Sequence, residues 1–159
     1  MRDAVTESGR PAKGNVAMDG RTVRDQSLEE LEGKFWGDPP ADATRVVATV
    51  YRLRQVPIGH LDVEGLRLLI GQHEGLDPLV PLAIEILETD PLAEGDYYPG
   101  DLLAAVLAVP ANHWRAHLQD HDRLSVVLDT VTDPQGKLRE EAGFDVDEAA
   151  ISFRRTITR

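Results

Sequence analysis

Apolar side chains recur at helical spacing along most of this chain. Over residues 43–54 one face is apolar and arginines occupy the other; the apolar face consists of Val46, Val47, Val50, Tyr51 and Leu53. Apolar spacing together with capping residues predicts further short helices at residues 28–32, 63–72, 78–87, 99–108, 113–120, 124–131, 134–142 and 147–157. Glycine- and proline-rich turns separate these segments. We therefore predict a compact all-α domain of about six to eight short helices.

The predicted helix boundaries follow from capping and proline chemistry. Four of the segments follow a residue whose side chain can accept a hydrogen bond from a backbone N–H of the first turn, namely Ser27, Asp62, Asp77 and Asn112. Gly75 is expected to end the helix at residues 63–72. Pro81 then falls within the first turn of the helix capped by Asp77, where the backbone N–H has no intrahelical partner in any case. Two segments are ambiguous: residues 124–131 are rich in β-branched side chains, and residues 151–153 could alternate as a strand.

The first 26 residues differ in composition from the rest. They hold five basic and four acidic side chains, three glycines and scattered apolar positions, which is too little apolar surface to offset the entropy of ordering. We predict a disordered tail at residues 1–26 and one helical domain at residues 27–159. Removing the tail's +1 from the formal charge of −11 leaves −12 for the predicted domain.

Charge and composition restrict the possible partners. An acidic protein repels phosphate backbones and anionic lipid and attracts cationic proteins, so nucleic acid is not expected as a direct ligand. The chain has no cysteine, which excludes disulfides and thiolate metal sites. No run approaches the ~18 apolar residues of a membrane span, and residues 1–26 lack the apolar region of a signal peptide. We expect a cytoplasmic protein that does not bind membranes.

The stretch at residues 90–103 carries the strongest functional pattern. Between two apolar helical runs it concentrates acids, adjacent tyrosines and turn residues, including Glu94, Asp96, Tyr97, Tyr98 and Asp101. Such a connection is expected on the surface, where tyrosines offer contact area and carboxylates pair with cations. We call residues 90–101 the acidic loop and interpret it as a binding surface for a basic partner. A plain structured loop, and acid–base catalysis by Glu94 and Asp96, are the alternatives.

Two other groups of residues allow more than one interpretation. Phe35 and Trp36 are expected to anchor an irregular segment to the core, with exposure of Trp36 as a binding residue as the alternative. His113, His117 and His121 share one face if their helix is continuous, which would suit a metal ion. The HExxH glutamate is missing, however, and no nucleophilic serine motif or phosphate-binding glycine loop occurs. We predict no catalytic residue, metal ion or cofactor.

Several segments in order resemble a known family. They are Ser27–Glu32, Trp36–Pro40, Val63–Gln72, Leu79–Ala83 and Glu94–Leu103, and together they resemble the contact-dependent growth inhibition (CDI) immunity proteins over about residues 27–114. The resemblance implies a small, mostly helical antitoxin of the cytoplasm. Such a protein binds and blocks the C-terminal toxin domain of an effector delivered by a neighbouring cell, often a nuclease.

Charge and resemblance together predict a non-enzymatic inhibitor of a basic toxin. The expected partner-binding residues are those of the acidic loop, Glu94, Asp96, Tyr97, Tyr98 and Asp101, and, outside it, Trp36, Gln72 and Glu74. Two other functions stay open on the sequence alone. One is a metal-dependent enzyme built on His113, His117 and His121, and the other is a helical scaffold module without a toxin partner.

Overall fold

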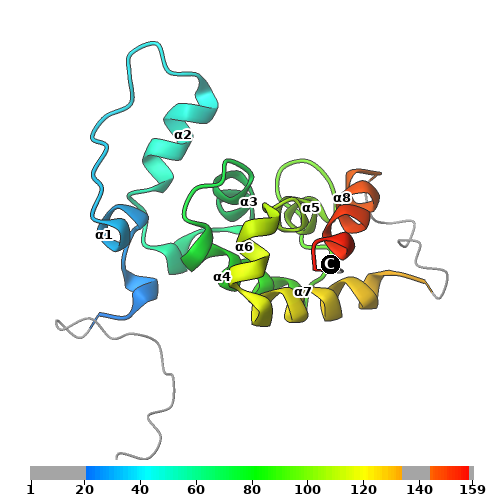
Figure 1. Ribbon diagram of the computed structural model, residues 1–159. Helices are drawn as coiled ribbons and strands as arrows, with labels where there is room; N and C mark the ends of the chain where they lie inside the picture. Colours follow the sequence, from blue (N-terminus) through cyan, green and yellow to red (C-terminus); the bar gives the residue numbers. More distant parts are fainter. Residues whose placement is uncertain (1–20, 134–143, 158–159) are drawn as a thin grey trace, which may run out of the picture.

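A computed structural model describes residues 21–133 and 144–157 of the chain (Figure 1). Over these residues the chain forms eight α-helices and two 3-10 helices and no named strand, which confirms the predicted all-α fold. None of the described helices is both long and apolar enough to cross a membrane. The helix predicted at residues 134–142 lies outside the described residues.

Residues 21–26, which lie before the predicted domain boundary at Ser27, are folded. Residues 21–26 include a 3-10 helix, η1 (Val23–Asp25), whose Thr22 N–H donates to the Asp25 carboxylate at 2.9 Å. This segment lies against η2 (Ile58–His60), and the Ile58 N–H donates to the Gln26 carbonyl at 2.9 Å. The half-buried Val23 packs on the core, so residues 21–26 belong to the domain and not to a tail. Residues 1–20 of the predicted tail lie outside the described residues.

The core is built around a short, almost completely buried helix, α5 (Asp101–Leu107). It packs between α3 (Val63–Gly71) and α8 (Phe144–Arg155). The longer helix α4 (Leu76–Thr89) packs on α3 and α5 and, on another side, on α7 (Leu118–Val131), which follows the short α6 (Ala111–Ala116). Each fully buried leucine of this core contributes about 2 kcal/mol of burial free energy, so α5 is fixed firmly. The acidic loop enters α5 directly.

The two helices before α3 form an arm at one end of the molecule. α1 (Leu28–Glu32) is joined by an irregular segment to α2 (Arg45–Leu53), which packs against α3 and projects from the body (Figure 1). Because α2 has few neighbours, Val46 and Val47 stay 44% and 40% exposed. Phe35 is 71% exposed and Trp36 38%, so the prediction that both rings anchor this segment to the core is wrong.

The ends of α1 and α3 follow the predicted capping chemistry in part. Ser27 Oγ accepts the Glu30 N–H at 3.2 Å, Asp62 Oδ1 accepts the Gly65 N–H at 2.7 Å, and both caps are confirmed. The end of α3 differs, because His73, not Gly75, is the left-handed residue there, with a φ of 58°. The N–H groups of the two residues at this end, His73 and Glu74, each donate to a carbonyl of the last turn at 2.9 Å, which closes the helix.

The predicted starts of α4, α5 and α6 are corrected. Gly75, with a φ of 60°, precedes α4. The Leu28 side chain packs directly against it, and a Cβ on residue 75 would lie 2.4 Å from that side chain. Pro81 is therefore the sixth residue of α4, beyond the first turn. α5 begins at Asp101 after the left-handed Gly100, not at Pro99. Asn112 is the second residue of α6 and not its cap, which is Pro110.

The ambiguous segments resolve as helix. Residues 124–131 are the second half of α7, and their apolar face, which consists of Leu124, Val127, Leu128 and Val131, is buried as predicted. Residues 151–153 lie in α8, where Phe153 is buried. The helix predicted at residues 113–120 is interrupted, because α6 ends at Ala116 and α7 starts after His117, whose φ is −132°.

Candidate protein-binding surface

Two carboxylates hold the acidic loop from beneath. Asp101 Oδ1 accepts the Gly95 N–H at 2.6 Å and its Oδ2 accepts the Tyr97 N–H at 3.1 Å. Glu64, from α3, accepts the intervening Asp96 N–H at 3.0 Å. Three consecutive backbone donors are thus satisfied by ionised acceptors, which form stronger hydrogen bonds than neutral ones. The tip of the loop is fixed to the rigid helices α3 and α5.

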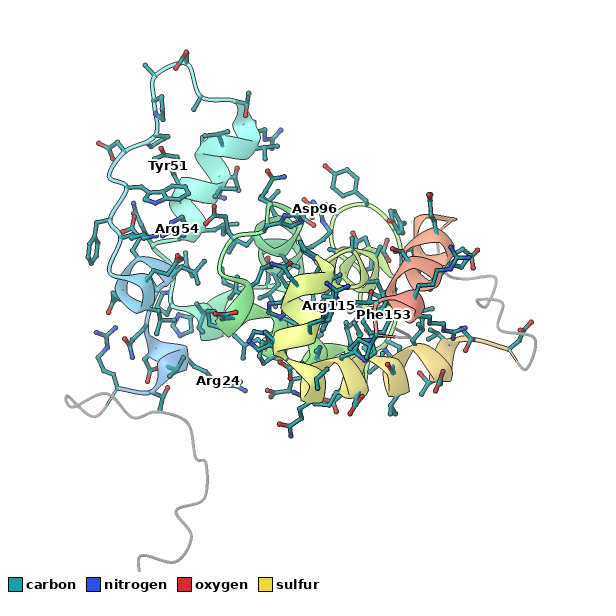
Figure 2. All side chains as sticks on the ribbon, viewed as in Figure 1. Arg24, Tyr51, Arg54, Asp96, Arg115 and Phe153 are labelled. Atoms are coloured by element: carbon teal, nitrogen blue, oxygen red, sulfur yellow. The ribbon has the colours of Figure 1, made fainter. Side chains whose placement is uncertain are left out.

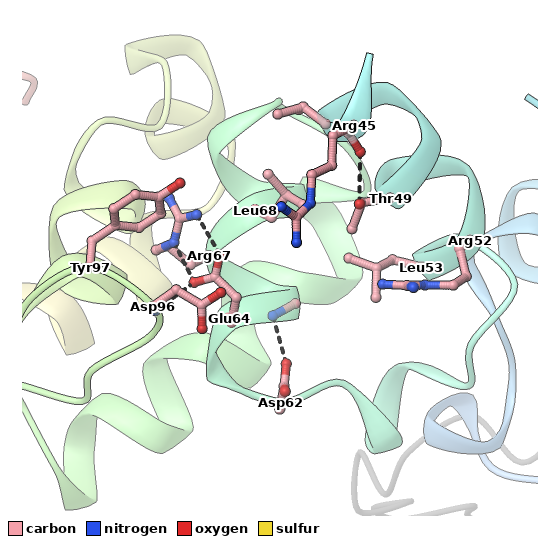
Figure 3. Close-up of a pocket in the computed structure, with 12 residues that line it drawn as sticks. Arg45, Thr49, Arg52, Leu53, Asp62, Glu64, Arg67, Leu68, Asp96 and Tyr97 are labelled. Atoms are coloured by element: carbon pink, nitrogen blue, oxygen red, sulfur yellow. Dashed lines mark hydrogen bonds and ion pairs between the residues drawn. The ribbon is translucent and has the colours of Figure 1, made fainter. Parts of the chain in front are cut away.

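A cation completes this attachment. Arg67 donates two hydrogen bonds to Glu64, at 2.7 and 2.6 Å, and its guanidinium lies 4.5 Å from the centre of the Tyr97 ring (Figure 3). The hydrogen bonds from Arg67, and to a lesser extent the Asp96 N–H, lower the pKa of Glu64 below its ordinary value, while Glu64 raises the pKa of Arg67. Both side chains therefore keep their charges through the neutral range, and Tyr97 rests on a fixed guanidinium.

The loop residues predicted to bind a partner divide into two groups. Glu94, Asp96 and Tyr97 point outward, and Tyr97 is 70% exposed. Tyr98 is half-buried against the core, and Asp101 is 3% exposed with its carboxylate directed at the loop backbone. The expectation that the whole stretch displays its acids is therefore corrected for Asp101, which shapes the loop from inside.

The predicted residues outside the loop meet in a second place. Trp36, Gln72 and Glu74 line one hollow of about 170 Å³ together with the apolar face of α2. Two of the residues that line it, Trp36 and Glu74, contact Arg54, a fully buried side chain that donates to Glu32 and to Glu74, both at 2.9 Å. The guanidinium lies 4.1 Å from the centre of the Trp36 ring, whose other neighbour is the edge of Tyr51 at 4.9 Å. Figure 2 shows Arg54 and Tyr51 at the base of the arm.

A groove of about 490 Å³ separates the acidic loop from the arm (Figure 3). Asp96 and Tyr97 line one side, and Arg45, Thr49 and Arg52 of α2 line the other. Val46 borders both this groove and the hollow at Trp36, so the two predicted groups of residues belong to one continuous region. Sequence reasoning missed the groove arginines and the supporting pair Glu64 and Arg67, although the latter stand at the (i, i+3) spacing typical of helix ion pairs.

The histidine face predicted for a metal-dependent enzyme does not form as expected. The break at His117 interrupts the helix that would align the three rings. His121 packs on the core instead, stacked 4.4 Å from Phe153 and set edgewise to Trp114. His113 and His117 do lie together, with ring centres 4.1 Å apart.

Comparison with known proteins places the chain in a family. The sequence profile of the CDI immunity proteins matches residues 30–124, which include α2 to α6, the acidic loop and the residues that line the groove. No curated protein and no solved structure matches the chain. The matched segment covers more than half of the sequence, so the chain belongs to the family of CDI immunity proteins.

Proposed function

We propose that this immunity protein binds the C-terminal toxin domain of its cognate effector through the acidic loop and the adjoining groove, and that the toxin is a basic, nuclease-type domain. The observation that carries the proposal is the construction of the loop. Its outward residues, Glu94, Asp96 and Tyr97, are exposed, while its backbone N–H groups donate to carboxylates of α3 and α5. A surface ordered before binding loses little entropy on complex formation.

Charge supports the choice of a basic partner. Residues 27–159 carry a formal charge of −12, and a nuclease presents cationic side chains to the phosphates of its substrate. An acidic protein is attracted to such a cleft, and the attraction speeds association. The inhibitor needs no catalysis of its own, because occupation of the cleft excludes the substrate. We place this encounter in the cytoplasm, where a delivered nuclease meets nucleic acid.

The second part of the proposed interface is the hollow at Trp36. A partly exposed tryptophan backed by a buried arginine has the chemistry of an interface hot spot. Gln72 is exposed beside it and can hydrogen-bond to a partner. Arg45 and Arg52 in the groove between the two parts can pair with an acid of the toxin, which would set the orientation of the complex.

The double variant Asp96→Ala/Tyr97→Ala tests the loop. Neither side chain supports the core, so the far-ultraviolet circular dichroism should stay unchanged, while toxin affinity should fall by about 2 to 5 kcal/mol, or roughly 30-fold or more. The measurement is calorimetric titration with the cognate toxin domain. A full-affinity complex with the double variant would place the interface elsewhere.

A matched control removes an acid and an apolar side chain from another exposed surface. On α7 the Asp122 side chain is 85% exposed and Val126 is 64% exposed, so Asp122→Ala/Val126→Ala should bind the toxin as the unchanged protein does. Co-expression with the toxin domain tests the function itself. Growth should be rescued by the unchanged protein and by the control, and less well by the loop variant; failure of the unchanged protein to protect cells would contradict neutralisation of that toxin.

A further inference from the structure

Three side chains from separate parts of the fold converge at the start of α4. Asp77 is the second residue of α4, His113 lies in α6, and His117 occupies the break before α7. Asp77 Oδ1 lies 3.7 Å from His113 Nδ1 and 3.5 Å from His117 Nε2. One nitrogen or oxygen from each residue falls within 4.8 Å of the others, at the edge of a hollow of about 540 Å³.

The hydrogen bond of His117 fixes which ring nitrogen faces Asp77. Its Nδ1 lies 2.8 Å from the backbone carbonyl of His113, which can only accept, so Nδ1 carries the proton. In the neutral ring Nε2 then presents a lone pair toward Asp77, whose ionised oxygens are also acceptors. Two facing acceptors need a positive charge between them, which either a proton on Nε2 or a bound metal ion supplies. Metal-binding histidines commonly show this arrangement, in which a backbone carbonyl orients the ring.

His113 brings a second ring nitrogen to the same oxygen. Its ring is buried, and within the described residues no protein group hydrogen-bonds to its Nε2. Its other ring nitrogen, Nδ1, lies 3.7 Å from Asp77 Oδ1 and is the one that faces the cluster.

We propose that Asp77, His113 and His117 form a binding site for a zinc-class divalent cation. Two imidazole nitrogens and one carboxylate oxygen are ligands that Zn²⁺ takes in three-residue sites, with a fourth position left for water. Ligands that share a tetrahedral zinc at ~2.0 Å lie ~3.3 Å apart. The two separations from Asp77 Oδ1, 3.5 and 3.7 Å, exceed this by a few tenths of an ångström, and the two histidine nitrogens, which lie within 4.8 Å of each other, must also approach. The Asp77 side chain is 80% exposed and has room to make that movement.

The ion would act as a tie between distant segments. It would join the first turn of α4 to the junction of α6 and α7. None of these three helices has an N-terminus capped by a side-chain hydrogen bond. The acidic loop contributes nothing to this cluster, so the proposal is independent of how the toxin is bound. Because the three ligands converge only in the folded protein, binding should raise its melting temperature.

The test uses the full chain without affinity-tag histidines, treated with a chelator and dialysed before ZnCl₂ is added. At free zinc about 100-fold above the Kd, the melting temperature should rise by about 5 to 10 °C, and calorimetry should give one ion per chain. Co²⁺ in place of Zn²⁺ should give the visible absorption of a tetrahedral site. No shift in melting temperature with zinc would overturn the proposal.

Matched variants assign the ligands. Asp77→Asn and His117→Gln change residues outside the core and should weaken zinc binding at least about 100-fold, since loss of a supporting residue alone costs 10- to 100-fold. His73 is an exposed histidine that lines the same hollow outside the cluster, and asparagine tolerates its left-handed backbone. His73→Asn should keep the full shift. Equal zinc responses from all three variants would contradict this site.

Discussion

The arm and the acidic loop display their aromatic rings by the same means. Trp36 rests on Arg54, which Glu32 and Glu74 hold, and Tyr97 rests on Arg67, which Glu64 holds. The difference is burial: the Arg54 side chain is fully buried and that of Arg67 is 20% exposed. Loss of the buried Arg54 ion pairs is therefore expected to destabilise the fold more than loss of the partly exposed Arg67 pair, because breaking a buried pair leaves a desolvated charge without a partner.

The largest expected effect separates the two arginines. Arg54→Met leaves Glu32 and Glu74 without their shared cation and should lower the free energy of unfolding by about 3 kcal/mol. Arg67→Met should cost only about 1 kcal/mol. Urea unfolding of both variants measures the difference. Equal losses would show that burial does not distinguish the two pairs.

The next effect tests the frame of the acidic loop. Asp101→Asn turns an amide donor toward the N–H of Gly95 or Tyr97 and should cost about 2 kcal/mol. Hydrogen exchange of the amides at residues 95 and 97 should also become faster. Asp96→Asn is the matched control, since the Asp96 carboxylate is exposed and its loss should leave stability within about 0.5 kcal/mol of the unchanged protein. If Asp101→Asn were as stable as this control, the loop would be held by other contacts.

A smaller effect follows from the close approach at Gly95. A Cβ there would lie 2.4 Å from Glu64 Oε2 and 3.0 Å from Asp101 Oδ2, so Gly95→Ala should displace both carboxylates and cost about 1 kcal/mol. Gly71→Ala provides the contrast, because its Cβ meets nothing within 4 Å and the change favours helix α3 by several tenths of a kcal/mol. Thermal unfolding of the pair should show opposite signs. A more stable Gly95→Ala protein would show that the two carboxylates do not approach residue 95 this closely.

The smallest effect concerns pH. The pKa of Glu64 is lowered below its ordinary 4.5 in the folded protein, so its ionised form contributes stability above that pH, and the contribution disappears as the pH falls through the lowered pKa. The difference in unfolding free energy between the unchanged protein and Glu64→Gln should therefore shrink below about pH 4.5. The measurement is urea unfolding from pH 6 to pH 3. A difference that stays constant over this range would mean that Glu64 is not held by Arg67.

The sequence predicted the helices well and their ends less well. Apolar spacing identified most of the described α-helices because burial of one face depends on that spacing, whereas α1 and α6 were predicted from the capping residues Ser27 and Asn112. The ends depended on contacts that spacing does not reveal. Gly75 adopts a left-handed conformation before α4 because Leu28 fills the space beside it, and His73 ends α3 where glycine is more usual. Both choices depend on tertiary packing.

The candidate site shows the same division. Composition identified the loop and its exposed residues Glu94, Asp96 and Tyr97, but the role of Asp101 could not be predicted, because an acid at a helix start can face solvent or the backbone equally well. The position of Trp36 was predicted wrongly for a related reason. Aromatic rings are usually buried, but here a buried arginine replaces the apolar surface beneath the ring.

The acidic loop keeps the residues that shape it apart from the residues that it displays. Glu64, Gly95 and Asp101 set the backbone path, whereas the side chains of Glu94 and Asp96 point outward and take no part in holding it. The displayed positions can therefore be exchanged for other residues without refolding the loop. If the toxin binds this loop as we propose, a few surface substitutions give a new specificity, and the same positions are the ones to randomise when the inhibitor is redirected to another target.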